Sequence, residues 1–185
     1  MRYGHFDNEK REYVIDRIDL PCSWTNYLGV EDMAAVVNHT AGGYLFYKTP
    51  EYHRISRFRA NAVPMDRPGF YVYLRDNDSA DYWSVSWQPV GKDLDRYENR
   101  CRHGLGYTKM TALYDEISSE AIYYVPLGKT HEVWALSVTN RSDRTRKLTL
   151  TGYAEFTNHN NYEQDQVNLQ YSLFITRTYL EDNRI

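Results

Sequence analysis

The chain has 185 residues, a length typical of one domain with a sizeable core. Its 22 Lys and Arg against 25 Asp and Glu give a formal net charge of -3, without the basic excess of a nucleic-acid-binding protein. Its apolar runs fall far short of the roughly 20 residues that cross a bilayer, so a membrane partner is not expected either. The start of the chain lacks the apolar core of a signal peptide, which predicts a cytoplasmic protein.

Short runs of aromatic and β-branched residues, separated by turn-forming residues, predict an all-β protein. Tyrosine is unusually frequent, with 18 residues against 6 Phe, and such side chains suit pleated, half-buried surfaces. A spacing of about ten residues between runs favours an antiparallel β-sandwich over βαβ units. Residues 33–38 fit a helical turn or a strand equally well. The predicted strands are residues 12–16, 43–48, 56–60, 69–75, 82–86, 107–114, 117–125, 132–139, 147–156 and 169–180.

Residues 132–139 show the clearest alternation of polar and apolar side chains. Trp134, Leu136 and Val138 share one parity, which predicts that this side of the strand faces the core. Residues 140–146 are polar and turn-like, and Leu148 and Leu150 again share a parity in the next run. We therefore expect residues 132–139 and 147–156 to form a hairpin.

Residues 155–170 combine amides, carboxylates, a histidine and a tyrosine with few apolar neighbours. Such a segment suits a hydroxyl-rich ligand, although Asn and Gln are also ordinary surface residues. His159 has polar neighbours on both sides, so no apolar face explains it. The chain stops soon after the next predicted strand, and we therefore expect it to be a piece of a longer protein.

Two further clusters have both a functional and a structural interpretation. Trp83 and Trp87 could stack on a sugar ring, but burial, either between sheets or against the missing part of a longer protein, is the better expectation. The arginines near residues 54–59 could bind phosphate bidentately. A structural ion-pair role is favoured for them, between Arg54, Arg57 or Arg59 and Asp66, Asp76 or Asp78.

Several segments, in order along the chain, resemble cellobiose phosphorylase and its relatives in glycoside hydrolase family ninety-four. The resemblance covers essentially the whole chain and is specific for the family, but not for cellobiose, laminaribiose, chitobiose or cellobionic acid as the substrate. It is carried by residues 1–15, 24–29, 40–47, 57–59 with 63–64, 82–84 with 87–90, 102–109 and 124–126.

The resemblance implies a place in a larger enzyme. Family members have an amino-terminal β-supersandwich, a helical linker, an (α/α)6 barrel and a small carboxy-terminal β domain. Residues 1–185 correspond to an incomplete, carboxy-terminally truncated amino-terminal sandwich domain, without the barrel. The family's reaction is inverting phosphorolysis of a β-linked disaccharide to an α-sugar 1-phosphate and a released sugar. Inorganic phosphate is itself the nucleophile, so one protein acid suffices and no other cofactor is expected.

The family's catalytic acid is an Asp on the barrel, so we expect no catalytic residue, no metal ligand and no activity in this chain alone. The resemblance implies a homodimer and a loop of this domain near the acceptor-side entrance. Asn160 falls on the asparagine of a Glu-Phe-x-x-x-Asn pattern, and Asn168 with Gln170 on a later Asn-x-Gln. His159 lies near a tryptophan of cellobiose-type members. We therefore expect His159, Asn160, Asn168 and Gln170 to bind a disaccharide or sugar 1-phosphate. The alternative is a free-standing carbohydrate-binding β-sandwich without catalysis.

Overall fold

The computed structural model describes residues 2–60, 66–157 and 177–182, and within these ranges it contains twelve β-strands and no helix. All paired strands are antiparallel, as the sequence predicts. The strands are β1 Gly4–Asp7, β2 Glu12–Ile15, β3 Thr25–Leu28, β4 Met33–Asn38, β5 Gly43–Tyr47, β6 Tyr71–Asp76, β7 Tyr82–Ser84, β8 Tyr97–His103, β9 Thr108–Tyr114, β10 Ile117–Tyr124, β11 Val133–Asn140 and β12 Leu148–Tyr153.

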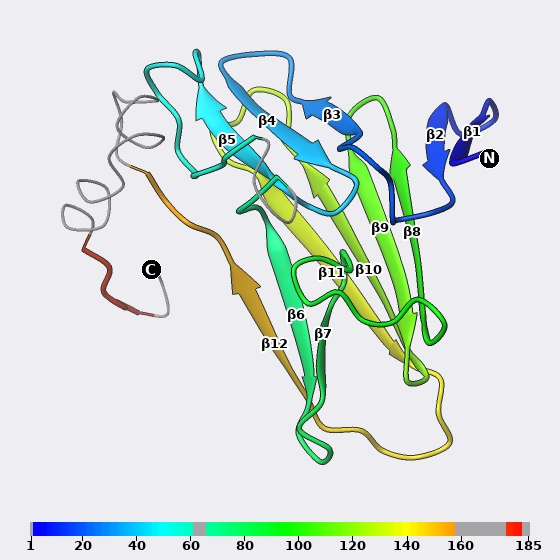
Figure 1. The fold of residues 1–185 in the computed structure, drawn as a ribbon. Helices are drawn as coiled ribbons and strands as arrows, with labels where there is room; N and C mark the ends of the chain where they lie inside the picture. The colour runs from blue at the N-terminus through cyan, green and yellow to red at the C-terminus, as the bar shows by residue number, and fades with distance from the viewer. Residues whose placement is uncertain (1, 61–65, 158–176, 183–185) are drawn as a thin grey trace.

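Three sheets make up a two-layered sandwich. One layer is a six-stranded sheet in the order β1-β2-β8-β9-β10-β11, and the other contains the sheets β12-β6-β7 and β3-β4-β5. Figure 1 shows the two smaller sheets in front of the large one. They are joined by a bridge between Gly42 and Gly69, where the Phe70 amide donates to the Ala41 carbonyl at 2.8 Å. A Cβ on Gly69 would lie 1.9 Å from that carbonyl oxygen, so this approach requires glycine.

One hydrophobic core lies between the layers and draws on all three sheets. In β9 and β10 every second side chain is buried, as expected for strands with one face toward solvent. The Tyr123 hydroxyl of β10 donates to the Phe70 carbonyl at 2.9 Å across the layers. Trp83 is fully buried, which confirms the expected burial, whereas Trp87 is half-buried and packs against the core.

Most predicted strands are confirmed, with shifted ends. Residues 33–38, whose sequence fits a helical turn or a strand equally well, form strand β4. Residues 56–60 do not form a strand, because Ser56 and Arg59 make only isolated bridges, to Phe156 and Arg67. Residues 169–176 lie outside the described residues, and 177–180 contain no strand. The sequence interpretation missed β1, β3 and β8; in β8, charged side chains on the solvent face mask the alternation.

The predicted hairpin is wrong, although its core face is right. Trp134, Leu136 and Val138 pack against the core, as does Leu148, whereas Leu150 is 48% exposed. However, β11 pairs with β10 in the large sheet, and β12 pairs with β6 in the other layer. The polar connection between β11 and β12 therefore crosses from one layer to the other.

A buried ion-pair group anchors this crossing at Arg146. Its guanidinium lies 2.6 Å from Asp76 at the end of β6 and 2.5 Å from Asp115 in the turn between β9 and β10. The side chains of Arg146 and Asp76 are 2% and 3% exposed. The amide of Ser79 and the guanidinium of Arg146 lower the pKa of Asp76 to about 2. Arg146 thus ties the lead into β12 to both layers at once.

Glu132 lies just before β11 and has a buried carboxyl oxygen. It is two residues before Trp134 and so shares its parity along the chain. Burial raises its pKa to about 8, against the opposing effect of a hydrogen bond from Trp134. In the described part of the chain its Oε1 has no hydrogen-bond partner. The folded protein therefore keeps a proton that the unfolded chain releases at an ordinary carboxyl pKa.

Replacing Arg146 should destabilise the fold strongly, because two carboxylates would lose their cation. We expect Arg146→Met to lower the free energy of unfolding by about 3 kcal/mol. Urea unfolding followed by circular dichroism measures this. The matched control is Arg144→Met, which removes an exposed arginine of the same connection. Equal stability of the two variants would contradict the role of Arg146.

Glu132 should make stability depend on pH. Between the ordinary carboxyl pKa and about 8, each rise in pH favours the unfolded, deprotonated chain, so the free energy of unfolding falls. Glu132→Gln should leave the free energy of unfolding nearly unchanged at pH values below that range. Above it, the variant should be more stable than the parent by about 5 kcal/mol. Urea midpoints across the range test this, with exposed Glu98→Gln as control. Parallel pH profiles for Glu132→Gln and the parent would refute it.

Candidate functional site

The four residues predicted to bind substrate, His159, Asn160, Asn168 and Gln170, lie outside the described residues. Their roles therefore stay predictions. The structure does describe the chain that leads into them, from β12 through Thr157. The candidate site therefore consists of this lead-in chain and the residues that contact it.

The chain after β12 runs antiparallel to residues 55–57. The Arg57 amide donates to the Glu155 carbonyl at 2.8 Å, and the Thr157 amide donates to the Ile55 carbonyl at 3.0 Å. Ser56 and Phe156 form the bridge between these two hydrogen bonds. The backbone is thus held on one side up to the last described residue before the predicted substrate segment.

A side-chain ion pair reinforces this backbone pairing. Arg57 is 7% exposed and its guanidinium lies 3.1 Å from a carboxylate oxygen of Glu155, which is 33% exposed. The other carboxylate oxygen accepts a hydrogen bond from the Tyr153 hydroxyl at 2.5 Å. Burial, and then this contact with Glu155, raise the pKa of Tyr153 to about 12. Tyr153 therefore remains a neutral donor at physiological pH.

The expected ion-pair role of the arginines is confirmed for Arg57, which pairs with Glu155, a carboxylate outside the expected set. Asp76, one of the expected partners, binds Arg146 instead. Arg54 lies with its guanidinium 4.0 Å from the ring centroid of Tyr44 and donates to the Phe58 carbonyl at 3.3 Å. Glu155 and Arg57 are 98 positions apart, so no local pattern indicated their pairing.

Three tyrosines lie beside this ion pair. Register places Tyr153 of β12 opposite Tyr71 of β6, and Tyr73 lies two residues further along on the same face. The Tyr71 and Tyr153 rings are stacked with centroids 6.1 Å apart, and Tyr73 meets Tyr153 edge-to-face at 6.3 Å. Aromatic rings with hydroxyl groups suit the alternating apolar and polar surfaces of a sugar.

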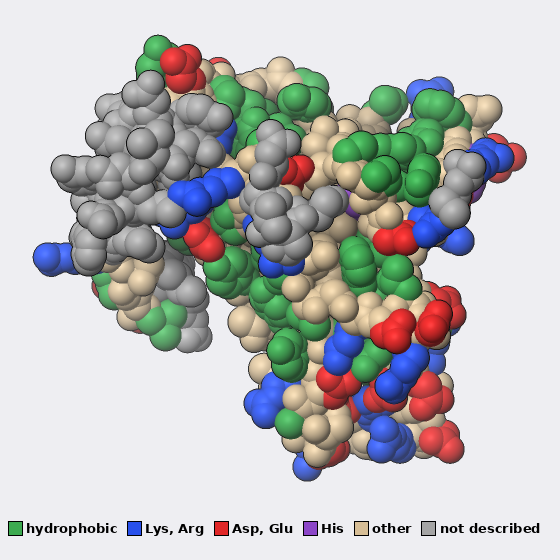
Figure 2. All heavy atoms as spheres, viewed as in Figure 1, with side chains coloured by type: hydrophobic (Ala, Val, Ile, Leu, Met, Phe, Trp, Pro, Cys, Tyr) green, Lys and Arg blue, Asp and Glu red, His purple; other side chains and the backbone are tan. Residues whose placement is uncertain are grey.

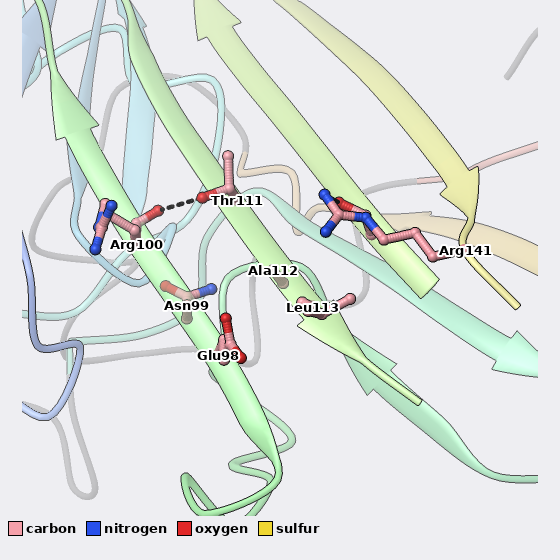
Figure 3. A pocket seen from close by; sticks show the side chains of 8 residues that line it. Glu98, Asn99, Arg100, Thr111, Ala112, Leu113 and Arg141 are labelled. Atoms are coloured by element: carbon pink, nitrogen blue, oxygen red, sulfur yellow. Dashed lines mark hydrogen bonds between the residues drawn. The ribbon is translucent and has the colours of Figure 1, made fainter. Parts of the chain in front are cut away.

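A polar pocket of about 220 Å³ lies on the solvent-facing side of the large sheet. Figure 3 shows Arg141 reaching over this pocket from the connection after β11, while the Arg100 side chain points away from Thr111. Arg141 donates to the Ser118 hydroxyl at 3.2 Å. This pocket has hydrogen-bonding groups but no aromatic ring. Its lining residues are Glu98, Asn99, Arg100, Thr111, Ala112, Leu113, Ser118 and Arg141.

Among residues 2–60, 66–157 and 177–182, no three His, Cys, Asp or Glu side chains come together as metal ligands. In the same ranges, no helix of sufficient length and apolarity to span a membrane is present.

Comparison with known proteins identifies relatives of the chain. The family model described as "Glycosyl hydrolase 94, supersandwich domain" matches residues 11–185. N,N'-diacetylchitobiose phosphorylases of Vibrio proteolyticus and Vibrio furnissii are 48% and 47% identical to the chain, over 96% of it. Solabiose phosphorylase of Paenibacillus borealis is 31% identical over 86% of the chain. In each case the match spans 22% of the relative's length.

Removing the Glu155 carboxylate should loosen the approach to residue 158. We expect Glu155→Ala to speed hydrogen exchange at the Arg57 and Thr157 amides by about tenfold, because the buried guanidinium loses this carboxylate. Exchange at β9 and β10 amides should not change. Glu120→Ala, which removes the carboxylate 3.6 Å from Lys109, is the control. Unchanged exchange at both amides in Glu155→Ala would show that the pair does not hold this segment.

Proposed function

Because the chain belongs to the supersandwich domain family of glycosyl hydrolase 94, we propose that it is the amino-terminal domain of an inverting disaccharide phosphorylase. Such an enzyme transfers the glycosyl group of a β-linked disaccharide to inorganic phosphate. The products are an α-sugar 1-phosphate and a free sugar. Phosphate is the nucleophile and needs no activating base, so a single carboxylic acid that protonates the leaving oxygen is sufficient.

The contribution we propose for this domain is one wall of the acceptor-side entrance. The observation that supports it is the contact between Arg57 and Glu155 at 3.1 Å. Both residues belong to segments that resemble the family, and their pairing holds the chain where it enters residues 158–176. His159, Asn160, Asn168 and Gln170 would then contact the sugar from that segment through amide and imidazole hydrogen bonds.

The relatives support a disaccharide of N-acetylglucosamine as the substrate. Two of them, at 47% and 48% identity, are chitobiose phosphorylases by name. The segment also departs from the cellobiose type, with His159 near the position of a tryptophan and an amide-rich run at residues 164–166. An amide-rich wall can donate and accept hydrogen bonds with an acetamido group as well as with hydroxyls.

The remaining expectations belong to the whole enzyme. The proposed catalytic Asp lies outside this chain, which alone would be inactive, and the enzyme would be a cytoplasmic homodimer without a cofactor besides its co-substrate phosphate. A free-standing carbohydrate-binding module is the weaker candidate, because the matched relatives named above are enzymes.

The proposal is tested on the longer enzyme that carries this chain. We expect it to release phosphate from N-acetylglucosamine 1-phosphate when N-acetylglucosamine is the acceptor, more efficiently than from glucose 1-phosphate with glucose. Asn160→Ala and Asn168→Ala should each raise the KM for the acceptor by about tenfold, with little change in the KM for the sugar 1-phosphate. Asn8→Ala, in the exposed turn after β1, is the control.

Failure with every sugar 1-phosphate would overturn the enzymatic assignment. Activity with unchanged acceptor KM in both variants would instead overturn the role of the segment alone.

A further inference from the structure

The outward face of the β12-β6-β7 sheet carries a concentration of tyrosines. Register places Tyr71, Tyr73, Tyr82 and Tyr153 on this face, and we call it the tyrosine face. The opposite parity of the same strands supplies core residues, among them Val72, Leu74, Trp83 and Leu148. Core packing of these residues therefore fixes the direction in which the tyrosine face points.

Much of the tyrosine face is open to solvent. Tyr82 is 55% exposed and Tyr153 39%, Tyr73 is half-buried, and Tyr71 is buried as part of the hydrophobic core cluster. Figure 2 shows hydrophobic side chains, a class that includes tyrosine, gathered along β6 on the side toward the viewer. Arg75, Thr149 and Thr151 share this parity and are exposed.

The rings form a connected surface. Tyr153 contacts both Tyr71 and Tyr73, with centroids 6.1 and 6.3 Å away. Tyr82 lies close enough to contribute to the raised pKa of Tyr73, whose main cause is burial. Glu155 accepts the Tyr153 hydroxyl and thereby fixes that ring. A surface held in this way loses little conformational entropy when a ligand binds.

The chemistry of the tyrosine face selects among ligands. Its described members include no aliphatic side chain. An interface with a helix or strand of another protein usually has an apolar centre, which this face lacks. Arg75 lies on the face, and Arg67 lies close enough to act on Tyr71 and Tyr73. Lys92 lies 5.9 Å from the Tyr82 ring centroid but is paired with Asp81. These cations are scattered around the rings and do not form the continuous basic stripe that a polyanion requires. Aromatic rings surrounded by hydroxyls, from tyrosine and from Thr149 and Thr151, match a chain of sugar rings with apolar C–H faces and equatorial hydroxyls.

We propose that the tyrosine face is a second sugar-binding surface, which binds β-linked oligosaccharides of hexose or N-acetylhexosamine units. The face is continuous with Glu155 and so with the chain that enters residues 158–176. An oligosaccharide on it would extend away from the proposed acceptor-side entrance. The class of sugar rests on the proposed function, whereas the existence of the surface rests on the exposed rings.

The test is an NMR titration of the 185-residue chain, labelled at tyrosine, with a β-1,4-linked tetrasaccharide of N-acetylglucosamine. We expect shifts at Tyr73, Tyr82 and Tyr153, and a dissociation constant about tenfold higher in Tyr82→Ala. Tyr82→Phe keeps the ring and should bind nearly as the parent does. Tyr27→Ala removes a 70% exposed tyrosine of β3 and should have no effect. An α-linked glucose tetrasaccharide should not bind.

A second measurement uses the longer enzyme. Tyr82→Ala should weaken binding of the tetrasaccharide to this enzyme and leave the KM for the disaccharide unchanged. Shifts elsewhere on the chain, equal binding by Tyr82→Ala and Tyr27→Ala, or no binding at all would overturn this surface. None of these results bears on whether the enzyme phosphorolyses a disaccharide, so the two proposals fail separately.

Discussion

The contact of Arg146 with the buried Asp76 and with the partly exposed Asp115 is the constraint on which the arrangement of this domain depends. A guanidinium with 2% of its side chain exposed needs carboxylate partners. Here they come from β6 in one layer and from the turn between β9 and β10 in the other. The chain that leaves β11 is therefore drawn away from the large sheet, and β12 pairs with β6 instead of closing a hairpin.

The position of β12 in turn determines what surrounds the candidate site. Because β12 lies beside β6, Tyr153 meets Tyr71 and Tyr73, and Glu155 reaches the buried Arg57. A hairpin between β11 and β12 would leave Arg57 without this carboxylate. The pairing of β12 with β6 thus links the stabilising contact of Arg146 before β12 with the contact between Arg57 and Glu155 after it.

The sequence predicts the elements of this domain better than their partners. Alternation identified β9, β10 and the core face of β11, since one side of each strand must be apolar. It could not place β12, because the partners that decide its sheet, Asp76 and Asp115, are distant in sequence. For the same reason the arginine cluster was assigned an ion-pair role but not Glu155 as the partner. The sequence predicts tyrosines on half-buried sheet surfaces, but only the strand register shows that four of them share one face.

The central claim is that the Arg57–Glu155 pair couples this fold to the acceptor-side entrance of an enzyme. A double-mutant cycle in the longer enzyme tests it most directly, with the acceptor KM as the measured quantity for Arg57→Met, Glu155→Met and the two together. If the pair acts as a unit, each single change should raise the acceptor KM and the double change should raise it no further. An acceptor KM that is unchanged in all three variants, or effects that simply add, would contradict the account.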